Sequence, residues 1–311
     1  MKKISLIVPC YNEASNIETF YNSFINTFHS IENQYIYEII FIDDGSEDET
    51  LDKMISLAKN DHNIKIIELS RNFGKEAALT AGLDVSSGDA IIPIDADLQD
   101  PVELILEMIS VWNSGAEIVL AKRINRSEDS WLKRVTASFF YKIHNSISDI
   151  KIPNNVGDFR LMDRSVVNAI KSLPEQQRFM KGLFSWVGFK TASIEYSRLA
   201  RNAGSTKFSG WKLWNFAIEG ITSFSSLPLR IWTYIGFLGA ISSLLYAFII
   251  IFKTIIFGID VPGYASLIVL LLFFGSLQLI GIGVLGEYIS RIYMESKKRP
   301  IYIIRNKHEF K

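Results

Sequence analysis

The stretch PIDADLQDP, residues 93–101, decides how the N-terminal part of the chain is expected to fold. It follows an apolar run and places Asp95, Asp97 and Gln99 at alternate positions. Alternate residues of an extended chain point to the same side, so we expect two carboxylates and one amide oxygen to face one direction. Such oxygen ligands suit Mg²⁺ or Mn²⁺, which usually also binds substrate phosphates. A solvated turn is the alternative interpretation of this segment.

The end of this stretch has a structural explanation of its own. Asp100 followed by Pro101 is typical of a helix start, with Asp100 as the N-cap and Pro101 as the first helical residue. The two carboxylates and the amide before them have no comparable explanation and are candidates for a metal site.

Short runs rich in Ile and Val alternate with segments of helical spacing up to about residue 125. We expect strands at 4–8, 37–42, 64–69, 90–94 and 117–121. We expect helices at 14–31, 47–59, 75–85 and 102–112. This alternation predicts an α/β fold with a doubly wound, mostly parallel sheet that is covered on both faces. Ligands of such sheets bind at the carboxyl ends of the strands, which here carry the segments PCYNE, DDGSED, SRNFGKE and DADLQDP.

The bulk composition excludes several classes of protein. The chain has 311 residues, with 33 Lys and Arg against 33 Asp and Glu, so its formal net charge is zero. This balance provides no basic field, and we expect no nucleic-acid partner. Cys10 is the only cysteine, which excludes a disulfide framework and a cysteine-rich zinc site. The length fits one large domain with an appendage.

The last third of the chain predicts membrane association. Residues 211–229 have the pattern of an amphipathic helix lying on a membrane surface. The stretches 231–252 and 262–286 contain no charged residue. As a helix, the first of them would span about 33 Å, close to the ~30 Å hydrocarbon core of a bilayer. We therefore expect two transmembrane helices within 230–290, and two buried core helices are the alternative.

Basic residues beside these stretches predict the topology. The linker GIDVPG contains none, whereas the outer flanks carry Arg230, Arg291, Lys297, Lys298 and Arg299. By the positive-inside rule, both termini are cytoplasmic. The expected organisation is a cytoplasmic α/β domain over 1–210, an interfacial helix over 211–229, two membrane helices over 230–290 and a cytoplasmic tail over 291–311.

The turn DDGS, residues 43–46, follows the second expected strand and by itself would be an ordinary Asp-Gly turn. Together with VPCYNE (8–13) and DADLQDP (95–101), it resembles the family-2 glycosyltransferases with the GT-A fold. The resemblance implies that the opening loop and the DDGS carboxylates hold a nucleotide, and that the D-x-D binds a metal ion on its diphosphate. It assigns donor binding to Pro9, Tyr11, Glu13, Asp43, Asp44, Lys75 and Asp95, and metal binding to Asp95, Asp97 and Gln99.

Three further motifs narrow the resemblance. They are SRNFGKEAALTAGLD (70–84), GDFRLMDR (157–164) and RFMKGLFSWVGF (178–189). Followed by two apolar stretches, they are similar to the polyprenyl-phosphate glycosyltransferases, and most of all to the bactoprenol glucosyltransferases. Dolichol-phosphate mannose synthases are more distant. The resemblance implies a UDP-sugar donor with glucose as the favoured sugar, undecaprenyl phosphate as acceptor, the bacterial inner membrane as location, and a homotetramer.

A lipid phosphate carries about −1.5 to −2 charges near neutral pH and would need cations to position it. Arg123 ends the fifth expected strand, and Arg134 and Ser138 stand four residues apart on an expected helix, so they share a face. The resemblance assigns these three residues to the acceptor phosphate, and a solvated helix face is the alternative. The basic segment 197–209 resembles a loop that closes over the diphosphate and acceptor. It supplies the candidates Arg201, Ser205 and Lys207.

Asp158, in the motif GDFR, is implied by the resemblance to orient the acceptor or to accept a proton, and a structural bond to Arg160 or Arg164 is the alternative. We adopt metal-dependent, inverting transfer of one sugar to undecaprenyl phosphate, with Asp97, Asp158 and Arg134 as catalytic residues. A processive polysaccharide synthase would carry Q-x-x-R-W and more membrane helices, and QQRFM (176–180) does not match that motif. A nucleotide-binding membrane scaffold without turnover is the other alternative.

Overall fold

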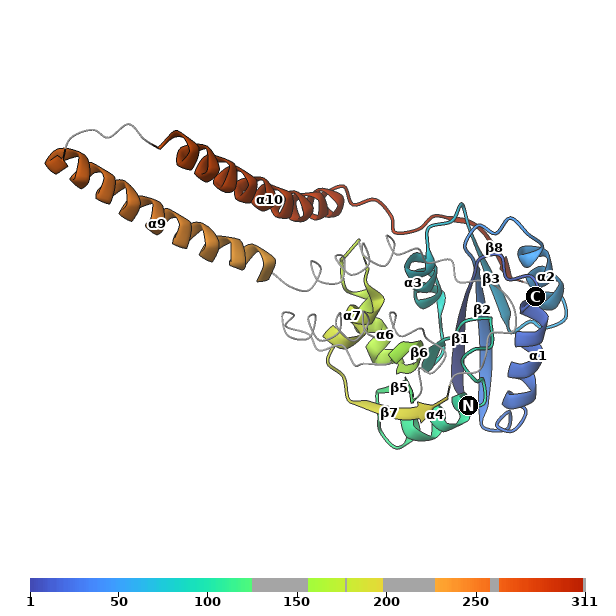
Figure 1. Ribbon diagram of the computed structural model, residues 1–311. Helices are drawn as coiled ribbons and strands as arrows, with labels where there is room; N and C mark the ends of the chain where they lie inside the picture. Colours follow the sequence, from blue (N-terminus) through green and yellow to red (C-terminus); the bar gives the residue numbers. More distant parts are fainter. Residues whose placement is uncertain (125–155, 177, 198–226, 258–262, 310–311) are drawn as a thin grey trace.

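The computed structural model describes residues 1–124, 156–176, 178–197, 227–257 and 263–309. Within this part of the chain, an α/β unit is built around an eight-stranded sheet. Two long helices extend away from it as an antiparallel pair, after which the chain returns to the α/β unit (Figure 1).

Four parallel strands form the centre of the sheet, in the order β4-β1-β2-β3. They are β1 (Lys2–Cys10), β2 (Tyr35–Asp43), β3 (Ile64–Leu69) and β4 (Ala90–Pro93). Their Ile-rich and Val-rich runs favour strands because β-branched side chains pack well on a pleated surface. The expected strands in this region are confirmed, with β1 and β2 extending further at both ends.

Helices cover both faces of the sheet, as the alternation predicted. One face carries α1 (Ile17–Phe28), α2 (Thr50–Ala58) and α4 (Leu104–Asn113). The opposite face carries α3 (Lys75–Val85), α6 (Arg164–Lys171) and α7 (Met180–Trp186). Along β1, Leu6 packs in the first layer and Ile7 in the second, because successive strand residues point to opposite faces.

The helix start predicted at Asp100 and Pro101 is wrong. α4 begins at Leu104, whose N–H donates to Pro101 O at 3.2 Å in a separate turn. The Asp100 carboxylate instead accepts a hydrogen bond from the hydroxyl of Tyr196. This partner lies far along the chain, so local sequence could not reveal it.

The other half of the sheet contains one strand that runs in the opposite direction. It contains β5 (Ile118–Arg123), β6 (Val156–Asp163) and β7 (Thr191–Tyr196). β6 is antiparallel to both β4 and β5, whereas β7 is parallel to β5. Because β6 runs backwards, its first residues lie at the edge where β4 and β5 end.

The C-terminal segment contributes a strand to the same sheet. β8 (Ile304–Glu309) pairs antiparallel with β3 and forms an edge of the sheet (Figure 1). The range 291–311, expected as a C-terminal tail, contains the end of α10 (Tyr264–Ser296) and β8. The boundary expected at residue 210 lies outside the described residues.

The long helices are α9 (Leu227–Phe257, 31 residues) and α10 (Tyr264–Ser296, 33 residues). Both expose large apolar side chains, including Phe237, Leu238, Phe273 and Ile289. In the described part of the chain, one stretch is long and apolar enough to cross a membrane, Phe273–Ser296. A second crossing by α9 therefore stays a prediction. Most of the expected interfacial helix, residues 211–226, lies outside the described residues. The last residues of its range, 227–229, form the start of α9.

Candidate active site

The polar segments meet at the carboxyl edge of the sheet, as expected. Cys10 and Asp43 are register partners at the ends of β1 and β2, and Pro9 pairs with Ile42. Pro9 and Tyr11, both expected to contact a nucleotide, are half-buried here. The first residues of β6 join this edge because that strand runs in the opposite direction.

The opening loop is tied to the DDGS turn by its backbone. Asn12 has a φ of 55°, and its N–H donates to Ser46 Oγ at 3.0 Å. Asn12 Oδ1 in turn accepts the N–H of Glu47 at 2.8 Å. The N–H of Glu13 donates to Thr50 Oγ1 at 2.9 Å. These bonds place the loop that carries the predicted nucleotide contacts beside the DDGS carboxylates.

Asp44 orders the loop that follows β3. Its carboxylate accepts the backbone N–H of Phe73 at 2.7 Å and that of Gly74 at 2.9 Å. Gly45 has a φ of 71°, and a Cβ there would lie 2.6 Å from backbone atoms of residues 71–72. The turn needs glycine for both reasons. The sequence did not indicate this positioning role of Asp44.

Burial raises the pKa of both Asp43 and Asp44. Asp43 Oδ1 accepts the N–H of Ser46 at 3.2 Å, which partly offsets that effect. A ligand that donates a hydrogen bond to either carboxylate would offset the free-energy cost of its burial.

Lys75, at the start of α3, joins two acidic residues from different strands. Its Nζ lies 2.7 Å from Asp95 Oδ1 and 2.9 Å from Asp158 Oδ2. Asp95 follows β4, and Asp158 lies near the start of β6. The structure therefore brings together three residues that sequence analysis assigned to the donor side and to catalysis.

Two neighbouring carboxyl groups in this cluster have opposite pKa shifts. Burial opposes ionisation of Asp158, but the charges of Lys75 and Lys181 outweigh it and hold the pKa of that carboxyl well below its usual range. Burial and the Asp158 charge raise the pKa of Glu76 to about 8. Glu76 Oε2 also accepts the N–H of Met180 at 3.1 Å. Sequence analysis missed Glu76, although it stands next to Lys75 in the motif.

The structural alternative for Asp158 is borne out through its backbone, since Arg160 Nε donates to Asp158 O at 3.4 Å. Arg160 is buried, and it also donates to Gly157 O at 2.6 Å and lies over the ring of Phe184. Arg164 donates to Gly88 O at 2.7 Å, away from this edge. The ion pair of Asp158 is with Lys75, and its Oδ1 is buried without a hydrogen-bond partner among the described residues.

The predicted metal ligands lie in a turn, and the expected extended geometry is wrong. β4 ends at Pro93, and Leu98 has a φ of 56°. The turn nevertheless keeps Asp97 and Gln99 together, because the N–H of Gln99 donates to Asp97 Oδ1 at 3.2 Å. Gln99 Oε1 is buried and has no hydrogen-bond partner in the described part of the chain, so this oxygen fits a divalent cation. No three His, Cys, Asp or Glu side chains gather as a metal site within the described residues.

Arg123 is already engaged by the protein. Its Nε donates to Tyr196 Oη at 3.0 Å, and its Nη2 lies 3.6 Å from Asp100 Oδ1. Gly157 leaves room for this guanidinium, since a Cβ there would lie 3.1 Å from Nη2. The sequence pattern indicated Arg123 but neither of these two partners. The other predicted acceptor residues lie outside the described residues: Arg134, Ser138, Arg201, Ser205 and Lys207.

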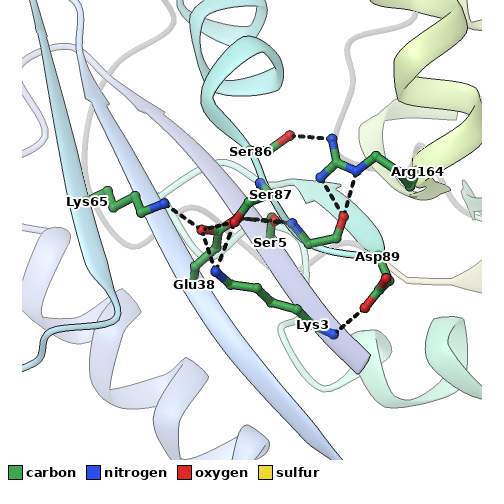
Figure 2. Close-up of polar contacts among 9 residues, drawn as sticks. Lys3, Ser5, Glu38, Lys65, Ser86, Ser87, Asp89 and Arg164 are labelled. Atoms are coloured by element: carbon green, nitrogen blue, oxygen red, sulfur yellow. Dashed lines mark hydrogen bonds and ion pairs between the residues drawn. The ribbon is translucent and has the colours of Figure 1, made fainter. Parts of the chain in front are cut away.

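A second polar cluster lies toward the amino ends of the strands, and Figure 2 shows its contacts. The buried Glu38 carboxylate accepts hydrogen bonds from Ser5 and Ser87 and forms ion pairs with Lys3 at 3.1 Å and Lys65 at 3.0 Å. Burial opposes its ionisation, but these donors lower the pKa of Glu38 to about 2. Both Glu38 oxygens have partners, so this cluster is a structural connection between strands.

The chain is similar to glycosyltransferases over nearly its whole length. Residues 5–171 match the family described as glycosyl transferase family 2. The chain is 57% identical to a bactoprenol glucosyl transferase of Shigella phage SfV over 307 residues, which cover 99% of each chain. It is 52% identical to an uncharacterized glycosyltransferase of Synechocystis, over 97% of this chain and 94% of that one.

A solved structure supports the fold. Glucosyl-3-phosphoglycerate synthase of Mycobacterium tuberculosis, in complex with uridine diphosphate, is similar with a TM-score of 0.50 and 19% identity. The similarity covers 71% of this chain and 79% of the synthase. At this identity the likeness concerns the fold alone.

Proposed function

The chain belongs to glycosyl transferase family 2, and we propose that it transfers one glucose from UDP-glucose to undecaprenyl phosphate at the cytoplasmic leaflet of a bacterial membrane. Its predicted class, a glycosyltransferase, and its resemblance to the bactoprenol glucosyltransferases are confirmed. The proposal for the acceptor rests on the printed function of relatives that match nearly the whole chain.

The observation that carries the proposed chemistry is Gln99 Oε1, which lies beside Asp97 and is buried without a hydrogen-bond partner among the residues that the structure describes. Asp95, Asp97 and Gln99 would hold Mg²⁺ or Mn²⁺. When bound, such an ion supplies Lewis-acid neutralisation of charge on the leaving diphosphate. Lys75 holds Asp95 in place and would also contact the donor.

The nucleotide would lie along the opening loop and the DDGS turn, in contact with Pro9, Tyr11, Glu13, Asp43 and Asp44. An oxygen of the lipid phosphate attacks C1 of the sugar, the bond from C1 to the diphosphate oxygen breaks, and UDP leaves with the bonding electrons. This in-line displacement inverts the anomeric centre. The attacking oxygen is already anionic near neutral pH, so no strong base is required.

Asp158 fits a positioning role better than that of a proton acceptor. A carboxyl group with so low a pKa binds a proton weakly, and its nearest cation is Lys75. We therefore assign Asp158 to the orientation of Lys75. The acceptor phosphate would be held by cationic and hydroxyl side chains, which are Arg123, Arg134, Ser138, Arg201, Ser205 and Lys207.

The long helices would hold this site at the lipid surface. We infer that α9 and α10 cross the membrane as a hairpin, with both termini cytoplasmic, an interfacial helix in the part of 211–229 that precedes α9, and a homotetrameric assembly. The exposed apolar side chains of both helices and the basic run Lys297–Arg299 after α10 support this arrangement. Near its end, α10 also contacts the α/β unit, because Glu295 accepts the N–H of Gln176 at 2.9 Å.

The test is a panel of radiolabelled nucleotide sugars incubated with purified protein and undecaprenyl phosphate. We expect label from UDP-glucose to enter the lipid phase only when a divalent cation is present. Transfer from another sugar nucleotide would revise the donor. Formation of a long polymer would favour the processive synthase, and nucleotide binding without transfer or hydrolysis would favour a scaffold.

A further inference from the structure

The chain that follows the two long helices is bonded to a buried acidic residue of the sheet. Glu68 of β3 is 6% exposed. Its carboxylate receives three side chains from β8: Arg305 at 3.2 Å, Asn306 at 2.8 Å and His308 at 3.3 Å. Such a concentration of donors on one buried carboxylate makes β8 a specific partner of β3 rather than a loosely added edge strand.

The C-terminal segment also forms hydrogen bonds with Ser70, the first residue after β3. The N–H of Ser70 donates to Ile303 O at 2.9 Å, and Arg305 Nη2 donates to Ser70 O at 3.0 Å. Both backbone groups of Ser70 are therefore bonded to the C-terminal segment. Just before β8, Tyr302 donates to Asp84 at 2.8 Å and fastens the same segment to α3.

The loop that starts at Ser70 is in turn part of the donor side. Its residues Phe73 and Gly74 donate both backbone N–H groups to Asp44, and its residues 71–72 lie against Gly45. The next residue is Lys75, which pairs with Asp95 and Asp158. A continuous series of bonds thus connects β8 to the DDGS turn.

We propose that β8 is a positioning strand for the nucleotide, and that Arg305 and Glu68 act as positioning residues through the 71–74 loop. This inference rests on the proposed function, in which the DDGS turn meets the nucleotide. It means that the donor site of the α/β unit is complete only when the chain has passed through both long helices and returned. Nucleotide affinity then depends on a segment that touches no nucleotide.

The experiment compares full-length protein in detergent with the variant Arg305→Ala. The matched control is Lys307→Ala, which removes an exposed cation from the same strand and lies outside the set of residues that bond Glu68. Binding of UDP with Mn²⁺ is measured by calorimetry, and amide hydrogen exchange is followed over residues 70–76. We expect Arg305→Ala to weaken UDP binding about tenfold, comparable to one hydrogen bond to a charged group, and to speed exchange at Phe73 and Gly74. Lys307→Ala should match wild type in both measurements.

A second variant, Glu68→Gln, keeps the shape of the side chain and removes its charge. We expect it to show the same changes, so it replaces Arg305→Ala in the test if that variant folds poorly. UDP affinity and exchange equal to wild type in both variants would overturn the inference. Failure of the wild type to bind UDP would count against the proposed function instead. In that case the exchange measurement, made without nucleotide, still decides whether β8 orders the loop.

Discussion

Two acidic clusters lie at opposite ends of the strands of one sheet, and they differ in how many of their oxygens accept hydrogen bonds. Glu38 accepts from Ser5, Ser87, Lys3 and Lys65, and the pKa of this carboxyl is lowered to about 2 (Figure 2). At the carboxyl edge, Gln99 Oε1 and Asp158 Oδ1 are buried without a partner among the described residues, and the pKa of Glu76 is raised to about 8.

This difference in bonding indicates which cluster stabilises the fold and which one is suited to bind a ligand. A buried carboxylate with all its donors in place stabilises the fold, and any ligand would have to displace those donors. Buried oxygens without donors, and buried carboxyl groups whose pKa is raised, destabilise the fold and gain most from binding a cation or a substrate. Substitutions in the two clusters should therefore have opposite consequences for stability and for turnover.

The largest effect on turnover is expected for Asp97→Asn. Loss of the charge of this proposed metal ligand should lower kcat by about 100-fold or more, because charge on the leaving diphosphate would no longer be neutralised. The protein should still fold, since the side-chain volume is kept. Sugar transfer and the thermal midpoint are measured together, and wild-type turnover with divalent metal would remove Asp97 from the metal site.

The variant Lys75→Met tests the ion pairs that Lys75 forms with Asp95 and Asp158. Without the ammonium group, Asp95 and Asp158 repel each other across the site. We expect turnover to fall by about 10- to 100-fold, because Lys75 orients Asp95, the proposed metal ligand. UDP affinity should weaken less. Lys75→Arg serves as the control that keeps the charge. Equal kinetics for Lys75→Met and wild type would show that the bridge has no role in transfer.

Glu38→Gln should have the reverse effect, with stability lost and catalysis kept. Removal of the charge weakens the bonds that Lys65 and Ser87 make to this buried carboxyl group and should cost about 2–3 kcal/mol of unfolding free energy. KM for the nucleotide sugar should stay at the wild-type value, because the cluster lies at the other edge of the sheet. Thermal unfolding and steady-state kinetics test both halves, and a large change in kcat without destabilisation would contradict the assignment.

The two clusters also predict opposite pH dependence. The pKa of Glu38 is lowered to about 2, so its contribution is fully present above the unfolded value of about 4.3 and is lost as pH falls through 2. The pKa of Glu76 is raised to about 8, so the folded state retains a proton that the unfolded state has released, and stability falls as pH rises from about 4.3 to 8.

The smallest expected effect is the loss of this second slope in Glu76→Gln. The amide imitates the neutral carboxyl group, so stability near pH 6 should change little. The thermal midpoint of wild type should fall between pH 6 and 8 more steeply than that of the variant. Parallel midpoint curves would mean that Glu76 is ionised in the folded protein.

Local pattern was sufficient for much of the fold and for part of the site. The Ile- and Val-rich runs predicted the parallel strands, and the polar segments after them predicted the functional edge. Asp95, Asp97, Asp158 and Lys75 were all identified from motifs. The extended geometry expected around Leu98 was wrong, because a turn with a left-handed residue replaces the strand after Pro93.

The sequence by itself determined the periodic elements, the family and the edge of the sheet at which the polar segments meet, because strand and helix periods and strand-end motifs are local properties of a chain. The tertiary structure alone decided that Lys75 joins Asp95 to Asp158, that Tyr196 takes Asp100 from its expected capping role, and that β8 returns to β3. These contacts join residues remote in sequence. Their free energy comes from burial and from charge pairing in the folded chain, and neither leaves a periodic trace in the order of the amino acids.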